Sequence, residues 1–356
     1  RKTEPKAATG RFAMADVYSS RNMAGVARGA IKKLLVLESL PKPVNFSGGP
    51  DLLTWLGTFT LERVLGTVPV EPDGSAFFEA PAGRQLFFVA LDAHDLSVKR
   101  MQSFTCLMPG EVLSCVGCHE QRTRTPENRP ALALDALKRP ASRIEPFAEF
   151  PDVLDFQRDI QPVLDRHCVR CHNPERREGR VNLAGDLGST WSLSYYSLLA
   201  FLQVADGRNG LGNQPARSLG SSASPLLRKL EGGHFGVKAS PQEWRTVWLW
   251  IESGAPYAGS YAGLRNQEQQ GIEGRAMGQV ARSGFSAVYQ KRCASCHAGK
   301  DVGEAMRMPF NFAERQKDRR AFSRPTGTHE RLVRPNDPIA IFSLEIMANF
   351  TRPEMS

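Results

Sequence analysis

The sequence predicts a mixed fold, in which a small β-sandwich-like middle domain is followed by mainly α-helical domains. Short apolar segments separated by Pro, Gly and Asp occupy residues 33–110, as is typical of β-strands joined by turns. Two later segments instead repeat apolar residues every three to four positions, which indicates amphipathic helices. One pentapeptide, Cys-x-x-Cys-His, occurs three times between residues 115 and 297.

Strands are expected at residues 34–37, 61–64, 67–70, 75–79 and 86–91. Between the third and fourth of these, Glu71-Pro72-Asp73-Gly74 predicts a hairpin-like turn. Residues 1–30 lack clear periodicity, so we expect them to be the remnant of an upstream domain. Residues 31–130 are then the β-rich middle domain, with the first pentapeptide in the loop that leaves it.

The helical part begins where Phe156, Ile160 and Leu164 recur every four residues and Cys168 continues the series. Pro162 must lie in the first turn of this helix or kink it. Two further helices are expected: one follows Ser224-Pro225, and the other follows a capping box in Ser240-Pro241-Gln242-Glu243. These elements define a domain at residues 148–265, and a truncated copy is expected at 275–356.

Six of the seven cysteines lie in the pentapeptides. The three sets are Cys115, Cys118 and His119; Cys168, Cys171 and His172; and Cys293, Cys296 and His297. Two thiols at this spacing can form thioethers with the vinyl groups of one haem, and the adjacent His can bind its iron. The chain is therefore predicted to carry three covalent haem c groups, and its helical domains to resemble cytochrome c.

Zinc or disulfide chemistry is the alternative for these cysteines. Structural zinc usually needs a second Cys or His pair within roughly 20 residues, whereas these motifs lie about 50 and 125 residues apart. Disulfides would leave the repeated His unexplained. Haem is the interpretation that accounts for every residue of the motif.

The iron ligands follow from the few available side chains. His119, His172 and His297 are the expected proximal ligands. His234 is the only other His between the second and third motifs, so it is expected as the distal ligand of the second haem. For the third haem, His329 is the leading candidate for the distal ligand, ahead of Met306, Met308 and Met347. Nothing obliges the first haem to have a sixth ligand, which makes it the expected open, reactive iron.

Composition narrows the class of protein. The formal charge is +9, but the basic residues are scattered, which argues against a nucleic-acid surface. No transmembrane segment is found, since no run of about eighteen apolar residues occurs. We expect an electron-transfer cytochrome in the periplasm or another extracytoplasmic compartment, with redox proteins as partners and its targeting signal upstream of Arg1.

Several phrases resemble a known family. Residues 65–75, 108–111 and 115–120 look like the middle domain of the hydrazine synthase alpha subunit family. Residues 153–171, 181–186 and 250–257 are similar to the cytochrome domain that follows it. The resemblance implies an upstream β-propeller, a reactive haem in the middle domain, a bis-His haem held by His172 and His234, and membership of a larger complex.

One departure from the family concerns the first motif. In the family a Tyr shortly after the motif ligates the middle-domain iron, and the motif His binds zinc. Here residues 120–124 are Glu-Gln-Arg-Thr-Arg, and the next Tyr is Tyr195. We therefore expect His119 to keep the ordinary proximal role. The second hypothesis is a haem oxidoreductase that acts on small nitrogen compounds at the open first haem.

Overall fold

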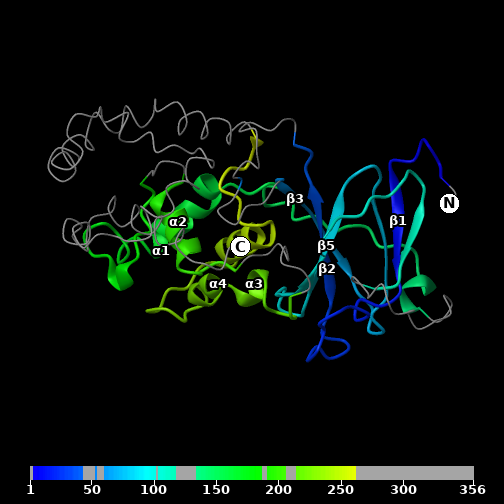
Figure 1. The fold of residues 1–356 in the computed structure, drawn as a ribbon, viewed down its shortest axis with the longest axis horizontal. Helices are drawn as coiled ribbons and strands as arrows, with labels where there is room; N and C mark the ends of the chain where they lie inside the picture. Colours follow the sequence, from blue (N-terminus) through cyan, green and yellow to red (C-terminus); the bar gives the residue numbers. More distant parts are fainter. Residues whose placement is uncertain are drawn as a thin grey trace, which may run out of the picture. The chain divides into compact units, whose positions relative to one another are not determined.

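The computed structural model describes residues 3–42, 53, 60–101, 103–117, 134–186, 191–205 and 214–261 (Figure 1). The chain divides into two compact units. The first unit is Arg1–Cys168 with Tyr195–Leu264, and the second is Val169–Ser194 with Arg265–Ser356. The first unit holds all the strands given below.

Seven strands form two sheets in the described part of the first unit. One sheet has the order β4-β1-β7, built from β1 (Thr9–Met14), β4 (Ala76–Pro81) and β7 (Val112–Cys115). The other has the order β3-β2-β5-β6, built from β2 (Lys33–Ser39), β3 (Glu62–Pro69), β5 (Leu86–Leu91) and β6 (Ser97–Arg100). Neighbouring strands are antiparallel except β1 and β7, which are parallel.

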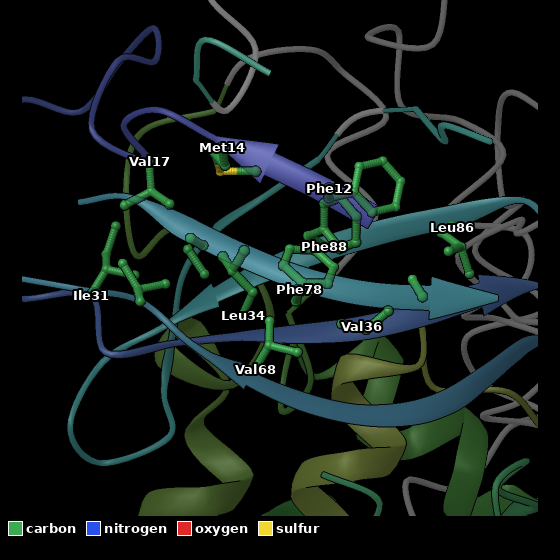
Figure 2. Packing of buried hydrophobic residues seen from close by; sticks show 14 of the residues in the cluster. Phe12, Met14, Val17, Ile31, Leu34, Val36, Val68, Phe78, Leu86 and Phe88 are labelled. Atoms are coloured by element: carbon green, nitrogen blue, oxygen red, sulfur yellow. The ribbon is translucent and has the colours of Figure 1, made fainter. Parts of the chain in front are cut away.

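Both sheets contribute to one apolar core, as Figure 2 shows. Phe12 of β1, Phe78 of β4 and Phe88 of β5 form a triad with ring centroids 5.1–5.4 Å apart. Leu34 and Val36 of β2 add aliphatic contacts from the second sheet. The prediction of a β-rich middle domain is confirmed.

Two expected strands turn out to be one. The segments 61–64 and 67–70 are expected as separate strands, but β3 runs from Glu62 to Pro69 and joins them through Gly66. The register against β2 shifts between Val36 and Leu37, so a β-bulge absorbs the irregularity. Gly66 has a φ of +136°, and a Cβ there would lie 2.1 Å from the Glu145 carbonyl oxygen. Only glycine fits at this close approach.

Two other local predictions need correction. The turn at Glu71–Gly74 forms, since the Gly74 N–H donates to the Glu71 carbonyl at 2.8 Å. However, β3 and β4 on either side of it belong to different sheets, so it is not a hairpin. Part of the segment 1–30 also has a defined place, because β1 lies at the centre of the three-stranded sheet.

The helices follow the strands in sequence. They are a π-helical turn at Phe156–Ile160, α1 (Gln161–His167), α2 (Leu193–Ala200), α3 (Gly220–Ala223), α4 (Pro225–Leu230) and α5 (Pro241–Glu252), with short 3₁₀ turns at Asp135–Lys138 and Glu178–Arg180. The starts of α4 and α5 match their predicted capping residues, and both halves of the Ser240–Glu243 capping box are present. The helix expected to lead to Cys168 forms in two parts, with Pro162 at the place predicted for it. A π-helical turn precedes α1, and Pro162 lies in the first turn of α1.

Aromatic side chains fill the core of the helical part within the first unit. Phe156 packs against Tyr195 and Tyr257 with ring centroids 5.0 and 5.8 Å apart. The polar groups of two buried aromatic residues have hydrogen-bond partners. The Tyr195 hydroxyl donates to the Ala255 carbonyl, and the Trp250 indole N–H donates to the Pro256 carbonyl, each at 2.8 Å. The aromatic residues of this region therefore act as structural core. Within the described ranges, no helix combines the length and apolarity that crossing a membrane would require.

Candidate functional site

The first motif begins at the end of a strand. Cys115 is the last residue of β7, and its carbonyl accepts the Ala15 N–H at 2.8 Å. The next carbonyl, of Val116, accepts the Asp16 N–H at 3.1 Å, so the parallel pairing with the β1 segment continues into the motif. A Cβ on Gly117 would lie 2.0 Å from the Ser19 carbonyl oxygen. The start of the motif is thus held tightly against the segment after β1, as a loop leaving the β-rich domain.

The second motif begins at the end of a helix. Cys168 is the C-cap of α1, and its N–H donates to the Leu164 carbonyl at 2.7 Å. Phe156, Ile160 and Leu164 are fully buried, so the predicted apolar face anchors this segment. The side chain of Cys168 is half-buried. The predicted delivery of the motif by an amphipathic segment is confirmed up to Cys168.

The remaining motif residues belong to the second unit. The Cys171 carbonyl accepts the Glu178 N–H at 3.2 Å, and the His172 carbonyl accepts the Leu183 N–H at 2.7 Å. Asn173 closes the turn by donating from Nδ2 to the Val169 carbonyl at 3.0 Å. Cys171 and His172 are both half-buried. Within the second unit, the thiol of Cys171 and the imidazole of His172 are partly accessible on this turn and are group types that covalent haem attachment uses.

A polar network ties α1 to the first turn of α5 within the first unit. The carboxylate of Glu243 accepts hydrogen bonds from the Ser240 N–H at 2.8 Å and is 3.1 Å from His167 Nε2. It also pairs with Arg166. Burial raises the pKa of Glu243, but the hydrogen bonds from Ser240 and His167 outweigh it and lower the pKa to about 2. Sequence reasoning found Glu243 as a capping residue, but not its link to the residue beside Cys168.

His234 lies on the loop between α4 and α5. The loop closes through a bridge between Glu231 and Lys238, and the Val237 N–H donates to the His234 carbonyl at 3.0 Å. The His234 ring is half-buried and contacts the Phe235 ring at a centroid distance of 4.8 Å. Phe235 is 96% exposed. The predicted presentation of His234 on a short loop is confirmed, whereas its role as an iron ligand stays a prediction.

Several predicted site residues lie outside the described residues. They are Cys118, His119, Cys293, Cys296, His297 and His329. Within the residues that are described, no three or more His, Cys, Asp or Glu side chains gather in a position to hold a metal ion.

The elements above define a class: a two-sheet β-rich domain that precedes a helical region, with one Cys-x-x-Cys-His motif starting at a strand end and another at a helix end. Residues 29–120 match the family model of the hydrazine synthase alpha subunit middle domain. A solved structure of Kuenenia stuttgartiensis hydrazine synthase matches with a TM-score of 0.52 and 19% identity, over 71% of this chain and 44% of that chain.

Residues 29–120 are thus similar to the middle domain of the hydrazine synthase alpha subunit, as the sequence phrases predicted for this part of the chain. At 19% identity the structural match shows the fold alone, and the chain spans less than half the length of that solved chain. No curated protein matches the chain.

Proposed function

We propose that this protein is a multihaem c-type cytochrome that transfers electrons outside the cytoplasm through three covalently attached haems. The observation that carries the proposal is the second motif, in which α1 ends at Cys168 and an ordered turn follows with Cys171 and His172. Bound haem would supply reversible Fe(III)/Fe(II) chemistry. The chain's own residues would attach it through the motif thiols and ligate it through the motif His.

The ligands of the proposal are those expected from the sequence. His119, His172 and His297 serve as proximal ligands, His234 as the distal ligand of the second haem, and His329 as that of the third. Bis-His ligation favours a low-spin iron that exchanges electrons rather than binding a substrate. Redox proteins of the same compartment are the proposed partners. The family model that matches residues 29–120 describes a subunit, which supports assembly into a larger enzyme.

The test is the number of covalent haems on the full chain after co-expression with cytochrome c maturation proteins in the periplasm. We expect three by intact mass and by the pyridine haemochrome spectrum. The double variant Cys168→Ala/Cys171→Ala should carry two, because it removes both thioethers of one site. Cys106→Ala is the matched control: Cys106 is exposed and lies outside the motifs, so three haems should remain.

Two results would contradict this proposal. A colourless protein with stoichiometric zinc would establish the zinc alternative. Three haems in the double variant would show that attachment does not occur at the second motif.

A second candidate function is a haem oxidoreductase that acts on small nitrogen compounds at the first haem. It is favoured by the family match to residues 29–120, which ends just after Cys118 and His119 and so includes the whole first motif. An open iron would give a high-spin signal that shifts when nitric oxide or carbon monoxide is added. Purely low-spin spectra, unchanged by either ligand, would leave electron transfer as the function.

A further inference from the structure

A buried carboxylate lies where β6, α3 and α5 meet in the first unit. Glu252, the last residue of α5, is fully buried. Its Oε1 accepts the Ser221 N–H at 2.8 Å, and its backbone carbonyl accepts Arg100 Nη1 at 2.5 Å. Its other oxygen, Oε2, is also buried and has no hydrogen-bond partner among the described residues. A buried carboxylate oxygen left in this state is strongly unfavourable.

A small cavity adjoins this carboxylate. Its volume is about 10 Å³, and it is lined by Ser97, Val98, Lys99, Arg100, Pro215, Leu219, Gly220 and Glu252. That volume is close to the minimum that holds a single water molecule. Ser97, Lys99, Arg100 and Glu252 are the lining residues with polar side chains, from which the two to four partners that a buried water requires would come.

Gly220 keeps the polar side of this region open. Its φ is +57°, and a Cβ there would lie 2.7 Å from Ser97 Oγ and 3.0 Å from each carboxylate oxygen of Glu252. Three oxygen atoms therefore converge on the space that any side chain at position 220 would enter. Because Gly220 has no side chain, the three oxygen atoms can keep these positions.

We propose that this cavity is a specific hydration site, in which one ordered water donates a hydrogen bond to Glu252 Oε2. Water is favoured over a monovalent cation because Lys99 and Arg100 line the same cavity, and their positive charges would repel a second cation at this short range. A water molecule satisfies the oxygen without adding charge.

The hydrated carboxylate would complete a polar link between one sheet and two helices. The Ser97 N–H of β6 donates to Ser221 Oγ at 2.9 Å, and Ser97 Oγ donates to the Leu219 carbonyl at 3.1 Å. Glu252 joins this cluster from α5 through Ser221 and Arg100. The bound water thus has a structural role: it helps to hold β6, α3 and α5 together. This role does not depend on haem.

The first experiment is a crystal structure of the full chain at a resolution that shows ordered water, together with a second crystal soaked in rubidium. We expect one peak within hydrogen-bonding distance of Glu252 Oε2, about 2.7–3.0 Å away, and no rubidium anomalous signal there. A rubidium signal at the site would contradict the proposal, because it would show that the site binds a cation instead of water. An empty cavity would overturn the proposal outright.

A pair of variants tests the same site in solution. Gly220→Ala should displace the water and lower the folding equilibrium constant, measured by guanidinium unfolding, about tenfold more than a strained glycine control does. The control is Gly83→Ala, because Gly83 also has a positive φ, +71°, but no heavy atom lies within 4 Å of its Cβ position. Equal losses in the two variants would show that only backbone strain matters, and would count against the site.

Discussion

Arg100→Ala should destabilise the protein by about 3–5 kcal/mol, which is a large share of the total stability of a typical domain. The Arg100 side chain is only 4% exposed and donates from Nη2 to Glu62 Oε2 at 2.6 Å. Its Nη1 donates to the Glu252 carbonyl, and its guanidinium lies 4.7 Å from the centroid of the Phe87 ring. Truncation would leave the Glu62 carboxylate buried without its countercharge, so the free energy of unfolding in guanidinium should fall steeply.

The matched control for this prediction is Arg84→Ala. Arg84 also pairs with a glutamate, Glu38 at 2.9 Å, but its side chain is 43% exposed, so its loss should cost about 1 kcal/mol or less. The double variant Arg100→Met/Glu62→Leu should recover most of the stability, because it removes both buried charges together. Equal losses in the free energy of unfolding for Arg100→Ala and Arg84→Ala would contradict the prediction, because the buried Arg100–Glu62 pair would then contribute no more than an exposed one.

Acidification should remove a second large contribution to the free energy of unfolding, which comes from Glu243. Its pKa is about 2 in the folded protein and 4.5 in its ordinary state. Since the folded-state pKa is the lower one, the unfolded chain binds the proton more readily. The stabilisation is therefore fully present above about pH 4.5 and is lost as the pH falls toward 2. We expect a loss of about 2 kcal/mol over this range, somewhat below the full linkage value because the network lies near the surface.

The variant Glu243→Gln isolates this effect. It should lower the free energy of unfolding at pH 7 and flatten its dependence on pH between 4.5 and 2, since it keeps the side-chain shape but loses the charge that His167 and Arg166 contact. Glu149→Gln, at an exposed position, is the control and should leave the pH profile of the wild type unchanged. A profile for Glu243→Gln as steep as that of the wild type would mean that other carboxylates cause the acid sensitivity.

The elements that could be predicted are those whose ends are determined by neighbouring residues. Ser224-Pro225 and Ser240-Pro241-Gln242-Glu243 placed the starts of α4 and α5 correctly, because a Pro in the first turn and, for α5, a capping box act within three or four residues. The buried face of Phe156, Ile160 and Leu164 was found for the same reason, since a periodic pattern is local. The haem chemistry assigned to the motif cysteines stays a prediction from their spacing.

The features that the sequence did not predict depend on contacts between residues far apart in the chain. Strand β1 was not recognised because its six residues become a strand only when β4 and β7 supply hydrogen bonds from either side. The break expected at Gly66 did not occur, because a bulge against β2 accommodates it. The helix before Cys168 was expected, but its first five residues form a π-helical turn, which the apolar pattern does not reveal.

The sequence by itself determined the presence of the three Cys-x-x-Cys-His motifs, the β-then-α order of the chain and the resemblance to the hydrazine synthase alpha middle domain, since each of these depends on residues close together in the chain. Only the tertiary structure decided which charges are buried and paired. Arg100 lies 38 positions from Glu62, whose carboxylate it pairs with, and 152 positions from Glu252, whose backbone carbonyl it contacts, and no local pattern marks them as partners. Their pairing arises because folding brings β6, β3 and α5 together and excludes water from between them.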